Sequence, residues 1–155
     1  MINHCALADD YHMKGYNCAQ GVLAAFSDLT GLSEAESVTV AGCFGMGAGS
    51  GELCGAVTGA IMVFGLMTPA DTNDPINSKL RAVAQGREFV KRFSEKFDAV
   101  RCEVLLPKAL TADDTTPAAK TLGITDHCSI LAVTAAEIVE KMLREREATE
   151  QQTGK

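Results

Sequence analysis

The segment from Leu53 to Leu66 is almost entirely apolar, and Thr58 is its one clearly polar residue. A helix that is apolar on every side is buried on every side, so this segment predicts the central helix of the fold. It is too short for an ordinary membrane span. No other part of the chain shows the sustained alternation of apolar and polar residues that marks a half-buried strand. We therefore predict an all-α fold, a compact bundle of about five to seven helices around residues 53–66.

Capping signatures indicate where the surrounding helices begin. The segments Asn17–Gln20 and Ser33–Glu36 have the residue types and the spacing of capping boxes. Asp74–Pro75 has the form of an N-cap followed by proline at the first helical position, and Asp126 is the expected N-cap of the last helix. The stripe that the helix after Pro75 is expected to bury consists of Ile76, Leu80, Val83, Val90, Phe93 and Phe97.

Length and composition limit the class of protein. The chain has 155 residues, 46% of them apolar, which suits one domain with a real core. Residues 1–147 are predicted to form a single helical domain, and the polar residues 148–155 a frayed tail. The net charge of −6 and the lack of a Lys/Arg-rich stretch argue against a nucleic-acid partner. No signal peptide is visible, so we expect a cytoplasmic protein without membrane insertion.

Six cysteines are the most informative residues for function. In the cytoplasm structural disulfides are rare, so cysteines there more often bind metal or undergo redox chemistry. A thiol near a helix N-terminus is biased toward the thiolate, the form that binds metals and attacks disulfides. The four cysteines expected in or near the first turn of a helix are Cys18, Cys54, Cys102 and Cys128.

The other two cysteines differ in their positions. Cys43 lies in a glycine-rich segment and is a possible spare ligand or partner for the same centre. Cys5 is expected to pack in the core from the first helix, because a free cysteine behaves as a small hydrophobe. His4 and His12, on the same helix, are expected at the surface.

The spacing of the cysteines excludes several common sites. The sequence has no C-x-x-C pair and therefore neither a zinc ribbon nor a thioredoxin-type dithiol, and it has no C-x-x-C-H haem attachment motif. Any shared site must be assembled by tertiary folding. Four cysteine thiolates suit an iron–sulfur cluster or Zn²⁺, so the sequence predicts a metal or redox centre between helices.

These motifs together resemble the redox-active protein family named for its C…CGAxxG…C…C pattern. The resemblance covers nearly the whole chain, from about Ala6 to Leu143, and it implies an all-α fold. The segments that carry it are Gly15–Gln20, Phe44–Gly47, Cys54–Val63, Cys102–Leu106 and Cys128.

The family is also similar to split-Soret cytochromes, whose non-haem part carries an iron–sulfur site bound by cysteines. By that resemblance Cys18, Cys54, Cys102 and Cys128 are the expected metal ligands, and a redox partner protein is implied. The haem function does not carry over, because this chain lacks the attachment motif. The segment Gly45–Gly47 has a central methionine where the family often has three glycines.

Residues near the cysteines suggest further roles. Gly45 and Gly47, within the loop Gly42–Gly51, either place backbone N–H groups near a bound cofactor, as nests do for anions, or belong to a flexible turn. The hydroxyl of Thr58, one turn after Cys54, donates either to that sulfur or to the Cys54 carbonyl.

His127 and Arg87 each have two alternative roles. His127 is adjacent to Cys128 and, if charged, lowers the pKa of that thiol; the alternative is a solvated histidine. Arg87 falls on the expected inward stripe, where it either balances the negative charge of a cluster or extends to water.

Three functional hypotheses remain open from the sequence. The first is an electron-transfer or redox-sensing protein with a four-cysteine iron–sulfur centre. The second is a thiol–disulfide protein in which the cysteines pair without metal. The third is a structural or partner-binding helical domain stapled by zinc. A shared apolar face would also permit a homodimer.

Overall fold

The helices of the protein follow the capping signatures of the sequence closely. The computed structural model describes residues 1–110 and 116–154. Within these residues the chain is all-α, as predicted, and its one β-bridge joins Leu53 to Arg101. None of the described helices has the length and apolar character needed to cross a membrane. The helices are α1 His4–Met13, α2 Cys18–Ala25, α3 Ser27–Thr30, α4 Glu34–Val40, α5 Gly55–Leu66, α6 Pro75–Phe97, α7 Cys102–Leu105, α8 Pro117–Leu122 and α9 His127–Thr153.

The number of α-helices exceeds the expected five to seven because short helices form where loops were expected. Nine α-helices lie within the described residues, among them the four-residue α3 and the six-residue α8. Proline at the first turn of α8 and left-handed glycines after both helices support these short elements. The predicted caps at Asn17, Ser33, Asp74 and Asp126 are all present with their side-chain hydrogen bonds.

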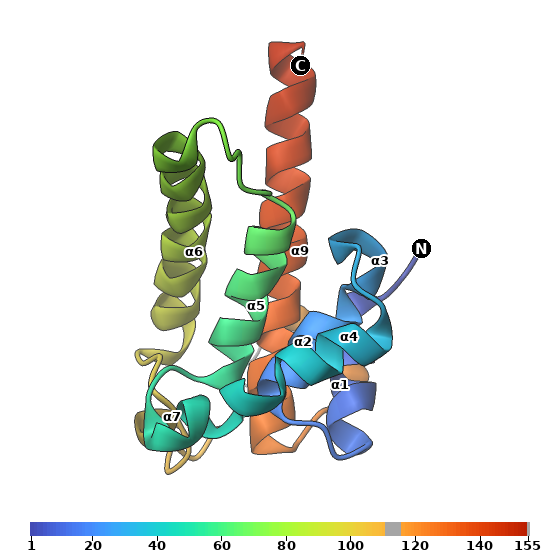
Figure 1. The fold of residues 1–155 in the computed structure, drawn as a ribbon. Helices are drawn as coiled ribbons and strands as arrows, with labels where there is room; N and C mark the ends of the chain where they lie inside the picture. Colours follow the sequence, from blue (N-terminus) through green and yellow to red (C-terminus); the bar gives the residue numbers. More distant parts are fainter. Residues whose placement is uncertain (111–115, 155) are drawn as a thin grey trace.

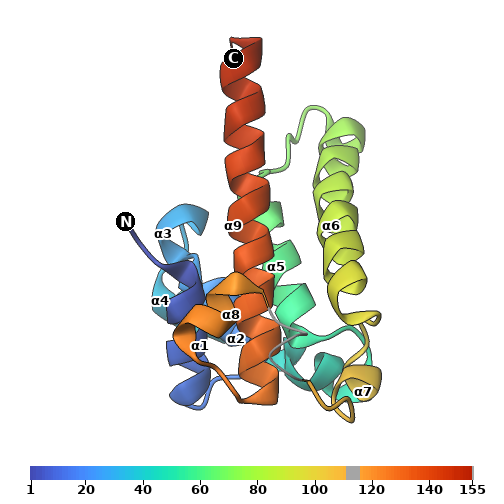
Figure 2. The same ribbon diagram turned by 180° about the vertical axis from the view of Figure 1, so that it is seen from behind.

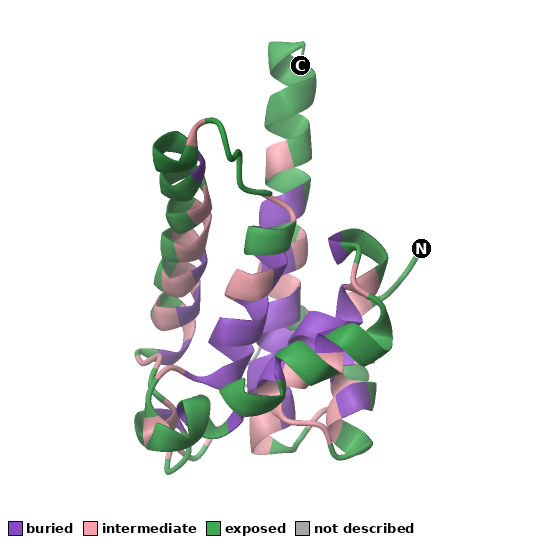
Figure 3. Ribbon diagram, viewed as in Figure 1, coloured by how far each residue is buried: buried purple, intermediate pink, exposed green. Residues whose placement is uncertain are grey.

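Helix α5 is the centre of the bundle, with α6 on one side and α2 and α9 on the other (Figure 1). Its first turns are buried, from Gly55 to Ala60 (Figure 3). Helix α2 approaches it closely, since a Cβ added at Gly59 would lie 2.8 Å from the backbone oxygen of Ala19. The prediction of burial on all sides fails for the second half of the helix, where Ile61 and Met62 are partly buried and Gly65 and Leu66 are exposed.

Helix α6 buries the second half of the expected stripe but not the first. Phe93 and Phe97 are buried as predicted, Phe89 is buried with them, and Val90 packs partly buried against the core. In its first half Ile76 is 66% exposed and Leu80 57% exposed, which corrects the prediction that they face inward. Val83 and Arg87 are exposed as well. The reason is that α5 ends at Leu66, so the body of the protein does not cover this flank of α6.

The first half of α9 is part of the core, whereas its second half projects beyond the body (Figures 1 and 2). The expected frayed tail from residue 148 is helical instead, up to Thr153. Arg146 and Glu150 form an ion pair one turn apart on this exposed part of the helix, with 3.1 Å between Nε and Oε1. Such pairs stabilise isolated helical turns.

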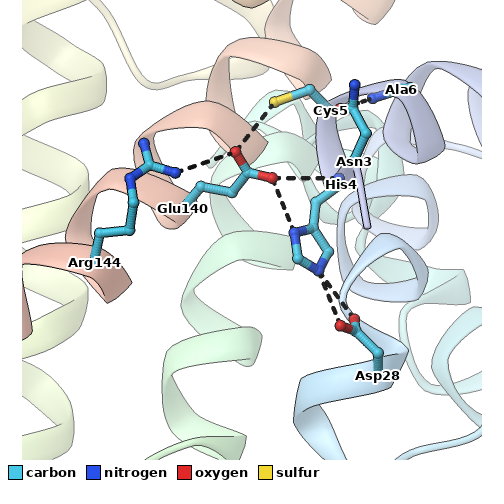
Figure 4. Close-up of polar contacts among 7 residues, drawn as sticks. All are labelled: Asn3, His4, Cys5, Ala6, Asp28, Glu140 and Arg144. Carbon is cyan, nitrogen blue, oxygen red and sulfur yellow. Dashed lines mark hydrogen bonds and ion pairs between the residues drawn. The ribbon is translucent and has the colours of Figure 1, made fainter. Parts of the chain in front are cut away.

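A mostly buried histidine joins α1, α3 and α9, on the side of α9 away from α6 (Figures 1 and 4). The ring of His4 lies between two carboxylates: Nδ1 is 2.9 Å from Oε1 of Glu140, and Nε2 is 3.0 Å from Oδ1 of Asp28. It also stacks on Phe26, with 4.2 Å between the ring centroids. His4 is therefore not the surface residue that the sequence suggested, because its side chain is only 12% exposed.

Cys5 lies beside this cluster and is buried, as expected for a packing residue (Figure 4). Burial, together with the nearby Glu140 carboxylate, raises the pKa of the Cys5 thiol to about 12. This thiol is therefore protonated and unreactive at neutral pH.

Candidate functional site

Each of the four cysteines lies at the start of a helix. Cys18 is the first residue of α2, Cys54 is the N-cap of α5, Cys102 is the first residue of α7, and Cys128 is the second residue of α9. Helices α5, α7 and α9 begin at the same end of the molecule (Figures 1 and 2). The thiols therefore come from four different elements, all with the positive end of a helix dipole nearby.

Backbone contacts hold two of these cysteines side by side. The Cys54 N–H donates to the carbonyl of Val100 at 2.8 Å, and the Cys102 N–H donates to the carbonyl of Glu52 at 2.6 Å. The segments before α5 and before α7 thus run antiparallel through the Leu53–Arg101 bridge. This pairing fixes α7 against the start of α5.

Helix packing adds the other two cysteines to the group. A Cβ added at Gly55 would lie 3.2 Å from the Cβ of Cys18, so the glycine after Cys54 allows α2 to reach this position. The thiol of Cys18 also faces α9, where it lies 3.9 Å from the carbonyl oxygen of Cys128. Contacts of α2 with both α5 and α9 thus place Cys18 between Cys54 and Cys128.

Each of the four thiols lies close enough to the other three to influence their ionisation. A hydrogen bond with Cys128 and then burial raise the pKa of Cys18 well above its usual range. Burial raises the pKa of Cys54 to about 11, although backbone N–H groups of Ala56 and Val57 counteract it. Burial and the nearby Cys128 also raise the pKa of Cys102. A negative charge on one thiol therefore disfavours negative charge on its neighbours.

Cys128 has the opposite tendency. The neighbouring Cys18 thiol and then His12 lower the pKa of Cys128 to about 7, although partial burial acts in the opposite direction. Cys128 is thus the thiol of the group that most readily becomes a thiolate at neutral pH.

His12 is a residue of this site that sequence reasoning placed at the surface. Its Nε2 is 2.7 Å from Oδ1 of Asp126, the N-cap of α9, and its side chain is 22% exposed. A second contact between the same helices joins the Ser129 hydroxyl to the Asp9 carboxylate. Helix α1 therefore holds the first turn of α9 on both sides of Cys128. No local pattern around His12 reveals this contact, because its partner is more than 100 residues away.

The glycine-rich loop packs against α7 with a left-handed backbone. Met46, Gly47 and Ala48 have φ values of 55°, 63° and 56°. A Cβ added at Gly47 would lie 2.9 Å from the Cβ of Cys102, so only glycine fits here. Gly45 lies against Asn17 in the same way, with 2.5 Å from an added Cβ to the Asn17 Cγ. Both glycines therefore keep the loop close to the cysteine group, and their role toward a cofactor remains a prediction.

The remaining predicted residues have different surroundings. The hydroxyl of Thr58 donates to the carbonyl of Gly55 at 3.1 Å, which corrects both of its predicted bonds. His127 has a buried Nε2 without a partner among the described residues, and the histidine that lowers the pKa of Cys128 is His12 rather than His127. Arg87 is exposed on α6, and Cys43 is exposed in the glycine-rich loop.

The donor set fits an iron–sulfur cluster in its chemistry. The four thiols are within electrostatic reach of one another, backbone N–H groups bond to the Cys54 thiol, and Gly55 and Gly47 allow close packing against Cys18 and Cys102. Within the described residues no three His, Cys, Asp or Glu side chains have the spacing for one ion. A tetrahedral Zn²⁺ with Zn–S bonds of about 2.3 Å would need the sulfurs roughly 3.8 Å apart. A single zinc ion would thus require the thiols to move closer.

Met46 provides a test of the loop conformation. A left-handed backbone costs a non-glycine residue roughly 1–2 kcal/mol, and Met46 is 75% exposed, so its side chain contributes little packing. Replacing Met46 with glycine should raise the free energy of unfolding in urea by about 0.5–1 kcal/mol, after the entropy of glycine is subtracted. The matched control is Met13→Gly in helical α1, also exposed, which should be destabilising. Equal losses of stability in both variants would contradict the left-handed conformation.

The fold and the site together define an all-α domain in which four helix starts bring cysteine thiols into one group. The model of the family described as "Putative redox-active protein (C_GCAxxG_C_C)" matches residues 16–142, and the chain belongs to this family. The match includes all four cysteines of the group. No curated protein and no solved structure matches the chain.

Proposed function

We propose that this protein carries electrons or senses redox state through an iron–sulfur cluster bound by Cys18, Cys54, Cys102 and Cys128. The observation that supports the proposal is the mutual influence of the four thiols on one another's pKa values. Thiols from four separate helix starts are within electrostatic reach of one another, at one end of the bundle. A cluster bound there would supply one-electron oxidation and reduction.

The electrostatics of the group favour a positively charged centre. Four thiolates in this region would lose hydration and repel one another. Burial first and the neighbouring thiols second raise the pKa values of Cys54 and Cys102, and the contact with Cys128 followed by burial raises that of Cys18. Metal cations remove the cost because a coordinating thiol is deprotonated outright. Helix dipoles and the N–H groups of Ala56 and Val57 stabilise the remaining negative charge on sulfur.

The surroundings of the site suit exchange of electrons with another protein. Cys54 is buried, whereas Cys102 and Cys128 are half-buried and lie nearer the surface. The apolar side chains of Phe44, Met46 and Val104 are exposed on the loop and helix next to Cys102. A redox partner protein would therefore reach the centre from the side of α7.

Anaerobic purification tests the proposal directly. Protein produced and kept without oxygen should be brown and should contain iron and acid-labile sulfide in stoichiometric amounts. Cys54→Ser should lose most of the iron and the visible absorbance, because it removes the most buried thiol of the group. Cys43→Ser is the control, since Cys43 is exposed and outside the group, and it should keep both.

Two results would overturn the iron–sulfur proposal. The first is colourless protein that takes up no iron after anaerobic incubation with ferrous iron and sulfide. The second is one equivalent of zinc that Cys54→Ser removes, which would favour the zinc-stapled structural domain instead.

A second function is favoured by one specific contact, the approach of the Cys18 thiol to Cys128, where the Cys18 Sγ lies 3.9 Å from the carbonyl oxygen and the two thiols shift each other's pKa. As a dithiol, the Cys128 thiolate attacks a disulfide of a partner protein, forms a mixed disulfide and releases one partner thiol. The Cys18 sulfur, on losing its proton, then attacks Cys128, releases the second partner thiol and closes a disulfide within the chain. Mass mapping of metal-free protein treated with oxidised glutathione should then show a Cys18–Cys128 bond; scattered pairing would exclude this function.

A further inference from the structure

An apolar groove lies between α5 and α6, away from the helix starts that carry the cysteines. Its floor is made of small residues: a Cβ added at Gly65 would meet no atom within 4 Å, and one at Gly86 would meet only Ile61. The other lining residues are Met62, Ala82, Val83, Arg87 and Val90.

The flank of α6 beside the groove extends this apolar surface. Ile76, Leu80 and Val83 follow one another at spacings of four and three residues and are 66%, 57% and 42% exposed. Such spacing is that of a helix seam that packs against another helix. An apolar patch of this kind on a folded protein marks an interaction site.

The charges around the groove are basic, in a chain whose net charge is −6. Arg87 is the one charged residue that lines the groove, and Lys79 lies exposed on α6, four residues before Val83 of the lining. None of the ion pairs among the described residues involves these two side chains. The exposed charges of α6 that are free to meet a partner are therefore positive.

We propose that this groove binds an acidic amphipathic helix of a partner protein. Apolar side chains of the helix would lie over Gly65 and Gly86 and against Val83, while its carboxylates would meet Arg87 and Lys79. The glycines matter because they let a helix backbone approach closely. A concave floor of this kind suits a helix better than a bilayer surface, which contacts protruding side chains.

The test uses a synthetic helical peptide with leucines at positions i, i+4 and i+7 and glutamates on both flanks. Backbone amide shifts in NMR should change at residues of α5 and α6 that line the groove, and fluorescence anisotropy should give a dissociation constant. Gly65→Leu fills the groove without a clash, because the added side chain enters open space, and it also improves helix propensity. It should weaken binding about tenfold or more, as should Arg87→Glu.

Two controls make the result specific. Lys120→Glu on α8, on the far side of α9 from α6 (Figure 2), changes the charge equally and should leave binding unchanged. A peptide of the same composition in scrambled order should not bind. The proposal fails if Gly65→Leu binds the peptide as wild type does. If Gly65→Leu leaves peptide binding intact but abolishes self-association in sedimentation, the groove is a surface between two copies of the chain. If it abolishes binding to anionic vesicles instead, the groove is a membrane-binding surface, and either result overturns the proposal. Because the cysteines take no part, these outcomes are independent of the metal content of the protein.

Discussion

At pH 7, iodoacetamide should modify Cys128 of the reduced, metal-free protein roughly a hundred times faster than Cys54. A thiol with a pKa of about 7 is half ionised at this pH, whereas one with a pKa of about 11 is ionised to about one part in ten thousand. The lower intrinsic nucleophilicity of the more acidic thiolate offsets part of this difference, by a factor of about 60 for a four-unit separation. Mass spectrometry of peptides after timed alkylation gives both rates.

The pH dependence of the same reaction distinguishes the two thiols. The rate at Cys128 should rise with pH up to about 8 and then level, because the thiolate predominates above its pKa of about 7. The rate at Cys54 should still be rising at pH 10. Since the neighbouring Cys18 thiol lowers the pKa of Cys128, Cys18→Ala should move the Cys128 inflection to higher pH. Equal rates with a common inflection near pH 9 would show that the thiols do not influence one another.

Replacing Gly59 with valine should lower the free energy of unfolding by about 3 kcal/mol, if the variant folds at all. A Cβ at this position would already lie 2.8 Å from the backbone oxygen of Ala19 and 3.0 Å from the Cβ of Val22. Relief requires α2 to move away from α5, because a backbone atom cannot rotate aside. Overpacking of a core typically costs about 1–3 kcal/mol, and a clash with backbone is at the upper end. Urea unfolding followed by circular dichroism measures the loss.

Gly65→Ala in the same helix is the matched control. A Cβ there meets no atom within 4 Å, so this variant should gain about 0.5–1 kcal/mol from helix propensity alone. A Gly59→Val protein as stable as wild type would mean that α2 and α5 are not in close contact. Cys18 would then also lie farther from Cys54, since the same two helices position both residues.

The starts of the helices were predictable because capping is local chemistry. Asn17 and Ser33 each bond to a backbone N–H three residues later, and the Gln20 and Glu36 side chains return the bond. These contacts lie within a single turn, so residue type and spacing are enough to recognise them. The same reasoning placed Cys18 and Cys128 correctly in the first turn of a helix, directly after Asn17 and Asp126.

Burial on α6 was less predictable, because an apolar stripe shows which face of a helix can be buried but not how much of its length a neighbouring helix covers. Ile76 and Leu80 have the spacing of a buried seam and are nevertheless exposed, whereas Phe89 is buried on the neighbouring face. The length of α5 decides the outcome, since that helix ends before it can cover the first half of α6. Tertiary context of this kind is absent from any local window of sequence.

Local chemistry in the chain accounts for the all-α class, the helix starts and a thiol at four of those starts. Packing between distant segments accounts for the rest: Gly55 and Gly59 let α2 approach α5, the Leu53–Arg101 bridge pairs Cys54 with Cys102, and α1 brings His12 to Cys128. Capping bonds span three residues, whereas the electrostatic coupling of the four thiols depends on helices more than 100 residues apart along the chain. Only the folded arrangement, therefore, makes Cys128 the acidic member of the group.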